Sequence, residues 1–140
     1  MKSEPEEWSW DQHARAPGGV AKWDGVRNHL ATNHLKAMRV GDLAFFYHTG
    51  DERRIVGVLR VVAEFRLDPA DETGKFGYVE CEAVAPLATP VTLAQVKAEP
   101  AMASWELVRS SRLSVMPVPA AHWDTLCRWG GLDPHALSES

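Results

Sequence analysis

The sequence has 140 residues, of which 45% are hydrophobic and 24% are charged, and this composition is typical of one globular domain. The formal net charge of −4 argues against binding a long duplex through many neutralised phosphates. No apolar run approaches the roughly 18 residues of a membrane span, and the acidic N-terminus MKSEPEEWSW lacks the apolar core of a signal peptide. We therefore expect a cytoplasmic protein, and a monomer, with no membrane contact.

Basic residues are concentrated in one part of the chain. Residues 21–60 hold seven basic and four acidic side chains, whereas residues 61–100 hold three basic and seven acidic ones. Such an asymmetry can be ordinary solvated surface. It is also compatible with a local basic face that binds a nucleotide or a short strand.

The first residues precede a short helical stretch. Residues 1–4 are expected to end a strand, because Pro5 has no N–H to donate to a ladder. In the stretch 6–16, Ser9 is the expected helix N-cap, with Gln12 at the capping-box position.

The stretch 22–50, KWDGVRNHLATNHLKAMRVGDLAFFYHTG, is the central unit of the chain. After a turn at 23–25, a helix is expected from about Arg27, with Asp24 as its N-cap. The residues expected on its apolar face are Leu30, Ala31, Leu35 and Met38. A second turn leads into strand 43–48, which is apolar on both faces. Polar and aromatic groups thus flank a rigid apolar body, where a binding site is expected.

The remaining elements are short and irregularly spaced. Gly57, within an expected strand at 55–65, indicates a bulge or a close backbone approach. The further expected elements are a strand at 78–84, a short helix opening at Thr92 and ending at Pro100, a helical piece at 101–105, a last strand at 113–119, and a helix at 120–129. Regular βαβ units would need longer helices between strands. The pattern instead favours a small curved sheet or partial barrel with peripheral helices.

Familiar catalytic and metal-binding motifs are missing from the sequence. It contains no GxxxxGK[ST], HExxH or GxSxG motif and no zinc-type spacing. His29 and His34 lie five positions apart, which does not place them on one helical face. Cys81 and Cys127 belong to no CxxC pair and are expected to be reduced thiols. We expect neither a cofactor nor a metal ion.

Four short stretches combine charged, hydroxyl and aromatic groups near the ends of elements. They are Lys2–Pro5, Trp23–Asn28, Tyr47–Thr49 and Arg109–Ser114. Each has a structural interpretation as well: a strand end, a core residue, a sheet residue, and solvated loop charge. Gly25 favours a functional interpretation of the second stretch, because glycine lets the backbone approach a ligand closely.

In order and spacing, KSEP, WDGVRN, GDLAFFYHT and SRLSVMPV closely resemble the EVE domain family of the PUA-like superfamily. The resemblance covers about residues 1–132 and implies an α+β fold, a PUA-like mixed β-barrel (pseudobarrel) with short peripheral helices, followed by a fraying tail at 133–140. Relatives usually carry a few aromatic and aliphatic residues before KSEP that form the first strand. Here Met1 directly precedes Lys2, so we expect either a short first strand or a chain that begins upstream.

The resemblance also implies a pocket that binds a modified base, notably a modified cytosine, in DNA or RNA, related to the pocket of YTH domains. The candidate ligand-binding residues are Lys2, Ser3, Glu4, Trp23, Gly25, Val26, Arg27, Asn28, Tyr47, His48, Thr49, Arg109, Ser111, Arg112 and Leu113. The expected stacking residues are Trp23 and Tyr47. The expected readers of the base edge are Ser3, Asn28, Thr49 and the backbone near Gly25 and Val26. The residues expected to meet phosphate are Lys2, Arg27, Arg109 and Arg112. His48 is expected to donate or accept a hydrogen bond.

Two alternatives remain open. Some PUA-like relatives of the ASCH group are small amidohydrolases that act on acylated cytidine, and Lys2, Glu4 and Thr49 supply the side-chain types that they use. Turnover of an acylated nucleoside would favour this enzyme. A protein-interaction domain is the other alternative, and it predicts an exposed apolar patch without a concave pocket.

Overall fold

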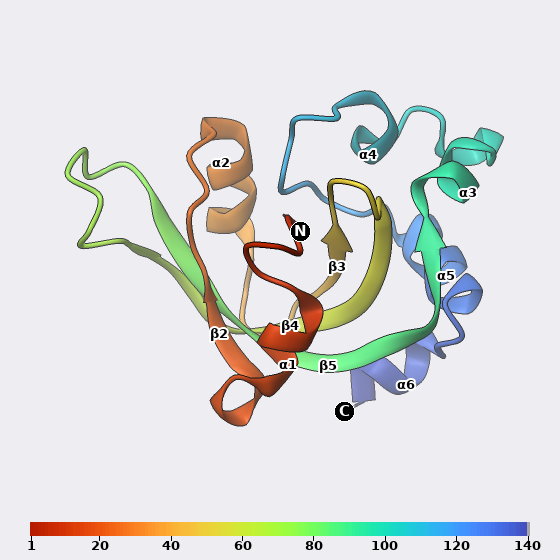
Figure 1. Cartoon of the computed structure of the whole chain (residues 1–140), viewed down its shortest axis with the longest axis horizontal. Coiled ribbons are helices and arrows are strands. Elements are labelled where there is room, and N and C mark those ends of the chain that lie inside the picture. Colours follow the sequence, from red (N-terminus) through yellow and green to blue (C-terminus); the bar gives the residue numbers. More distant parts are fainter. Residues whose placement is uncertain (140) are drawn as a thin grey trace.

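The computed structural model describes residues 1–139 and is built on a five-stranded mixed sheet with the strand order β1-β3-β4-β5-β2 (Figure 1). The strands are β1 (Lys2–Ser3), β2 (Val20–Trp23), β3 (Leu43–His48), β4 (Arg54–Leu67) and β5 (Gly77–Thr92). β1 pairs with β3 in parallel, and the other pairings are antiparallel. Figure 1 shows β4 and β5 bending strongly around the interior. The predicted α+β fold with a curved mixed sheet is confirmed, and the sheet does not close into a barrel.

Short helices surround the sheet, as predicted. They are α1 (Trp10–Arg15), α2 (His29–Ala37), α3 (Leu93–Lys97), α4 (Glu106–Arg109), α5 (Ala120–Trp129) and α6 (Pro134–Glu139), with 3-10 turns at Pro17–Gly19 and Pro100–Met102. The expected capping box between Ser9 and Gln12 is present, and a second one joins Thr92 and Gln95 at the expected start of a helix. Within residues 1–139, none of the helices combines the length and the apolar character that a membrane span requires.

Helix α2 begins later than the sequence predicted. Its N-cap is Asn28, whose side-chain oxygen accepts the backbone N–H of Ala31 at 2.9 Å, and not Asp24. Gly25 has a φ of 77°, which interrupts helical geometry after the turn. Leu30, expected on the apolar face, is 53% exposed. The later start therefore leaves residues 24–28 as a loop whose polar groups are not consumed by a helix.

Three C-terminal expectations differ from the structure. β5 does not end at residue 84 but continues through Pro86 and Pro90 to Thr92. The prolines are tolerated because β2 pairs with β5 only at residues 79–82, so the rest of β5 donates no N–H to β2. The stretch 113–119 forms no strand. It packs as an irregular segment because Leu113, Val115 and Met116 are buried. The stretch expected to fray contains α6, whose Leu137 is buried.

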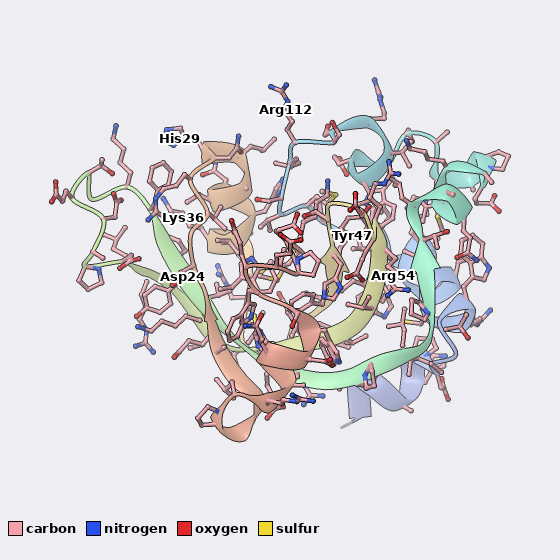
Figure 2. The ribbon with its side chains drawn as sticks, viewed as in Figure 1. Asp24, His29, Lys36, Tyr47, Arg54 and Arg112 are labelled. Carbon is pink, nitrogen blue, oxygen red and sulfur yellow. The ribbon has the colours of Figure 1, made fainter. Side chains whose placement is uncertain are left out.

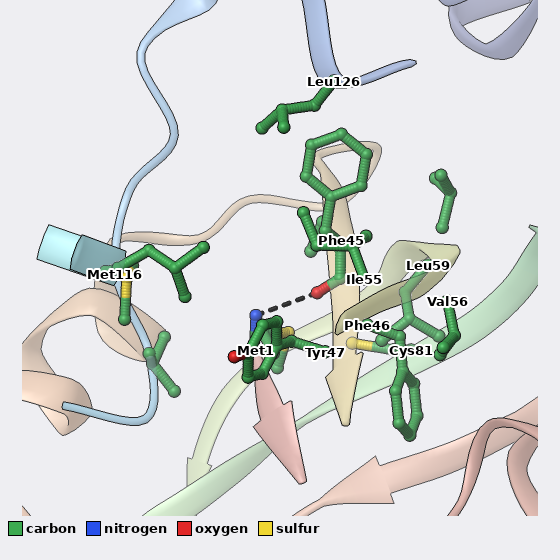
Figure 3. Close-up of a cluster of buried hydrophobic side chains, with 14 of the residues drawn as sticks. Met1, Phe45, Phe46, Tyr47, Ile55, Val56, Leu59, Cys81, Met116 and Leu126 are labelled. Carbon is green, nitrogen blue, oxygen red and sulfur yellow. Dashed lines mark hydrogen bonds between the residues drawn. The ribbon is translucent and has the colours of Figure 1, made fainter. Parts of the chain in front are cut away.

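Strand β3 is buried on both faces, as its uninterrupted apolar sequence predicted (Figure 3). On one side, Phe45 stacks on Trp123 of α5 with ring centroids 4.1 Å apart. On the other side, Phe46 meets the edges of Trp10 and Trp23. The nitrogen of Met1 donates to the Phe45 carbonyl at 2.9 Å, which extends the pairing of β1 with β3 by one residue (Figure 3).

Candidate nucleic-acid interface

A cleft of about 670 Å³ lies between the first residues of the chain and the segment that leads from β2 to α2. Its volume falls within the range of pockets that hold small molecules, about 300–1,000 Å³. The lining residues are Lys2, Ser3, Glu4, Glu7, Trp8, Ala21, Lys22, Trp23, Asp24, Gly25, Val26, Arg27, Asn28 and Ser114. The first two predicted stretches therefore meet around one hollow, although some twenty residues separate them.

The members of the candidate set that line the cleft are Lys2, Ser3, Glu4, Trp23, Gly25, Val26, Arg27 and Asn28. The members that do not line it are Tyr47, His48, Thr49, Arg109, Ser111, Arg112 and Leu113. Ser114, the last residue of the fourth stretch, also lines the cleft, and the other residues of the third and fourth stretches support it through the contacts described next.

Tyr47 is not placed as a stacking surface. It is 5% exposed and lies among the apolar residues of the core (Figure 3). The Lys2 ammonium is 5.8 Å from the centre of its ring. Tyr47 therefore supports Lys2 from beneath, and a bound base could not reach its ring.

His48 uses both ring nitrogens in structural hydrogen bonds. Its Nε2 accepts the backbone N–H of Trp10 at 3.0 Å, so Nδ1 carries the proton and donates to Glu52 at 2.9 Å. The hydrogen bond from His48 lowers the pKa of Glu52. His48 thus joins the start of α1 to the β3–β4 hairpin and has no ring nitrogen left for a ligand.

Thr49 and the fourth stretch hold the first stretch in place. The Thr49 backbone N–H donates to the Ser3 carbonyl at 2.9 Å, and the Thr49 hydroxyl donates to the Glu4 carboxylate at 3.3 Å. Lys2 donates through its Nζ to the Ser111 carbonyl at 3.2 Å and through its backbone N–H to the Ser114 carbonyl at 2.8 Å. These bonds fix the path of residues 2–4 along one wall of the cleft.

Arg109 and Arg112 are exposed, whereas Leu113 is buried in the core. Figure 2 shows Arg112 extending outward from the segment that follows α4. Neither arginine forms an ion pair within residues 1–139. They can meet a nucleic-acid backbone outside the cleft but cannot contact a base inside it.

Trp8 is a cleft residue to which the sequence analysis assigned no role. Its indole N–H donates to Nδ1 of His13 at 3.0 Å, and Nε2 of His13 bonds the Cys81 carbonyl at 2.8 Å. The Ser3 hydroxyl donates to the Trp8 carbonyl at 2.6 Å. The available signal was the clustering of Trp8, Trp10 and His13 in an otherwise polar stretch, but no spacing rule distinguishes a cleft tryptophan from a buried one.

Three cations line the cleft and none of them forms an ion pair within the described residues: Lys2, Lys22 and Arg27. Burial lowers the pKa of Lys2. The Arg27 guanidinium lies 5.5 Å from the centre of the Phe76 ring, and the Lys22 ammonium 4.8 Å from that of Tyr78. Aromatic rings attract cations without neutralising them, so these charges remain available to an anionic ligand.

The residues of the amidohydrolase alternative meet only in part. Lys2 and Glu4 line the cleft, and Thr49 does not line it although its hydroxyl donates to Glu4. Lys2 bonds the Ser111 carbonyl rather than Thr49. The described residues contain no group of three or more His, Cys, Asp or Glu that could hold a metal ion. The protein-interaction alternative predicted that a concave pocket would be absent, whereas the cleft is present.

Comparison with known proteins identifies relatives over nearly the whole chain. The EVE domain model matches residues 1–129. Among solved structures, Rpa0253 from Rhodopseudomonas palustris is 49% identical with a TM-score of 0.88, covering 96% of this chain and 94% of its own. Human THYN1, solved in complex with 5-methylcytosine containing DNA, is 29% identical with a TM-score of 0.86, covering 96% of this chain and 97% of its own.

More distant similarity extends to a second kind of domain. The YTH domain of Zygosaccharomyces rouxii MRB1, solved with N6-methyladenosine RNA, has a TM-score of 0.56 at 16% identity over 93% of this chain and 83% of its own, which shows a shared fold only. Mouse thymocyte nuclear protein 1 is 42% identical over 74 residues, which are 46% of this chain and 33% of that protein. The matched region thus spans about a third of the length of that curated relative.

Proposed function

This chain belongs to the EVE domain family, and we propose that it is a non-catalytic module that holds one modified base of a nucleic acid, a modified cytosine, in the cleft between Trp8 and residues 23–28. The observation that carries the proposal is the convergence of two tryptophans, a glycine turn and unpaired cations on a single hollow. The similarity to human THYN1 in complex with 5-methylcytosine containing DNA makes methylated DNA the first ligand to test.

The aromatic wall of the cleft supplies the stacking surface that a planar base requires. Trp8 is half-buried and is fixed at its N–H by His13, so its ring is held rather than free to rotate. Trp23 is 5% exposed and contributes only a small part of its surface. Stacking on an aromatic side chain contributes about 1–3 kcal/mol per base. Trp8 is therefore the main stacking surface, and Trp23 forms the back of the site.

The loop at 24–28 offers the hydrogen-bonding groups that suit an amino-pyrimidine. Asp24 has no hydrogen bond or ion pair within residues 1–139, so its carboxylate can accept from an exocyclic amine. The oxygen of Asn28 already caps α2, which leaves its NH₂ to donate to a ring nitrogen or carbonyl. Cytosine presents an amine beside an acceptor nitrogen, whereas thymine presents a carbonyl beside an N–H. Asp24 and Asn28 together therefore favour the hydrogen-bonding edge of cytosine over that of thymine.

Removing the stacking surface tests the proposal. Trp8→Ala is expected to weaken binding of an oligonucleotide with one 5-methylcytosine by about 5- to 150-fold, the equivalent of 1–3 kcal/mol. Titration calorimetry at fixed salt measures the affinity, with unmodified and thymine-containing oligonucleotides as comparison ligands. Trp129→Ala, which changes a half-buried tryptophan outside the cleft, is the matched control. Equal affinity of the unchanged protein for all three oligonucleotides would refute recognition of a modified cytosine.

The cleft cations make a separate prediction about salt. Arg27→Gln is expected to weaken binding of modified and unmodified oligonucleotides alike and to reduce the slope of log affinity against log salt by about 1, because one phosphate contact is lost. Fluorescence anisotropy over a range of NaCl concentrations measures the slope. Lys97→Gln, a change on the exposed part of α3, should leave it unaltered. An Arg27→Gln slope equal to that of the control would remove Arg27 from the interface.

A further inference from the structure

His13 is completely buried directly behind the two tryptophans of the cleft. Its ring centre is 5.8 Å from that of Trp8 in an edge-on arrangement and 6.3 Å from that of Trp23. It does not line the cleft itself. Any effect of His13 on a ligand must therefore act through the tryptophans.

The two hydrogen bonds of His13 require one protonation state. The Trp8 indole can only donate, so Nδ1 of His13 must accept with a free lone pair. The proton then resides on Nε2, which donates to the Cys81 carbonyl. Protonated His13 would place an N–H against the Trp8 N–H, and the bond that orients Trp8 would be lost. Burial lowers the pKa of His13, although the bond to the Cys81 carbonyl acts in the opposite direction.

We propose that His13 is the positioning residue of the cleft: in its neutral form it holds Trp8 in the orientation that stacks on a base, and in its protonated form it releases Trp8. The inference rests on the proposed function, because it assigns the affinity of that same cleft to a residue outside it. The proposal predicts that binding is complete above the ordinary histidine pKa of about 6.5. Binding is then lost as the pH falls through the lowered pKa of His13.

The charged groups around His13 do not supply an alternative partner. From β5, the Cys81 thiol has a pKa that burial raises to about 12, so it stays neutral. Glu80 and Glu82 alternate with Cys81 along β5 and point to the opposite face. The ring neighbours from β2 and β3, Trp23 and Phe46, carry no charge.

Four further titratable or charged groups lie on α1 itself or on segments close to it. Asp11 and Arg15 of α1 itself are exposed to solvent. His48 of β3 is engaged with Trp10 and Glu52. The Met1 amino group, which interacts with Cys81, has a pKa that burial lowers to about 5. Because the Met1 amino group titrates within the range of the test, a comparison with a variant that lacks His13 separates the two.

The first arm of the test needs no ligand. The indole N–H of Trp8 is followed by ¹H–¹⁵N NMR in the free protein from pH 8 to pH 5. In the unchanged protein its resonance is expected to titrate with His13. In His13→Asn, whose side-chain oxygen can accept but cannot be protonated, it should stay constant. The Trp105 indole, which donates to the Pro117 carbonyl at 3.0 Å and whose ring lies 5.6 Å from that of His122, is the internal control, and its response to pH should be the same in both proteins.

The second arm measures binding of the oligonucleotide with one 5-methylcytosine over the same pH range. Affinity is expected to fall about tenfold per pH unit below the folded pKa of His13, since one proton competes with binding. The slope should be absent in His13→Asn and present in His34→Asn, a change outside the cleft on α2. Trp8→Phe keeps a ring for stacking but has no N–H, and it provides the same test if His13→Asn does not fold.

The outcomes distinguish the two proposals. A flat binding profile in the unchanged protein, or an equal slope in His13→Asn, overturns the role of His13. A Trp8 resonance that does not respond to pH overturns it as well. Titration of Trp8 together with no binding of any oligonucleotide at pH 8 overturns the proposed function instead and leaves only the coupling of Trp8 to His13.

Discussion

Trp23→Ala is expected to lower the free energy of unfolding by about 3–5 kcal/mol, the usual cost of truncating a buried tryptophan to alanine. Trp23 is 5% exposed, and its ring meets Phe46 edge-on with centroids 5.1 Å apart. It is also the last residue of β2, where it pairs with Val79 of β5. Removing the indole leaves a cavity beneath the cleft that the surrounding strands cannot fill. Urea denaturation followed by circular dichroism measures the change.

This result would change how the site must be tested. The sequence predicted Trp23 as a stacking residue, whereas its burial makes the removal of the indole a large change to the core. Trp8→Ala is the control, because Trp8 is half-buried and its loss should cost binding more than stability. If Trp23→Ala unfolds at the same urea concentration as the unchanged protein, Trp23 is not part of the core that supports the cleft.

Local chemistry made much of the fold predictable. Both capping boxes follow from residue types three positions apart, and the uninterrupted apolar sequence of β3 marks a strand covered on both faces. Helix α5 occupies the predicted residues 120–129. The fold predictions that failed depended on neighbours distant in sequence. Pro86 and Pro90 argue against a strand until it is known that β2 pairs with β5 only as far as residue 82.

The site was predictable where it is formed by contiguous residues. Residues 2–4 of KSEP and all of WDGVRN line the cleft because each stretch occupies one wall, and residues 24–28 remain a loop. The burial of Tyr47 and His48 could not be predicted, because the sequence does not show that the cover over both faces of β3 extends to its last two residues. His13 was missed because its partners are distant in sequence. Its role depends on hydrogen bonds to Trp8 and to Cys81, and the second of these spans 68 positions.

Gly57→Ala is expected to lower the free energy of unfolding by about 3 kcal/mol, at the upper end of the usual cost of overpacking a core. A Cβ at this position would lie 2.5 Å from Cε3 and Cζ3 of Trp10. Gly57 also pairs with Phe46 on one side and Pro86 on the other, so the backbone of β4 cannot move away. The sequence predicted a bulge or a close backbone approach here, and the structure contains both, because the pairing register of β4 shifts between Ile55 and Gly57.

The damage should extend to the cleft, because Trp10 is the first residue of α1 and α1 carries His13. Displacing Trp10 would move His13 away from Trp8, so Gly57→Ala is expected to weaken oligonucleotide binding as well as stability.

Trp10→Phe lacks the fused ring that contains Cε3 and Cζ3. Adding it to Gly57→Ala should therefore cost less than the sum of the two single changes, which a double-mutant cycle of unfolding free energies measures. In Gly18→Ala a Cβ would meet nothing within 4 Å, but the φ of 67° strains the backbone of an alanine, so this variant reports the cost of strain without crowding. Additive costs in the cycle would show that Trp10 is not what forbids a side chain at Gly57, and the link from β4 through α1 to the cleft would then be lost.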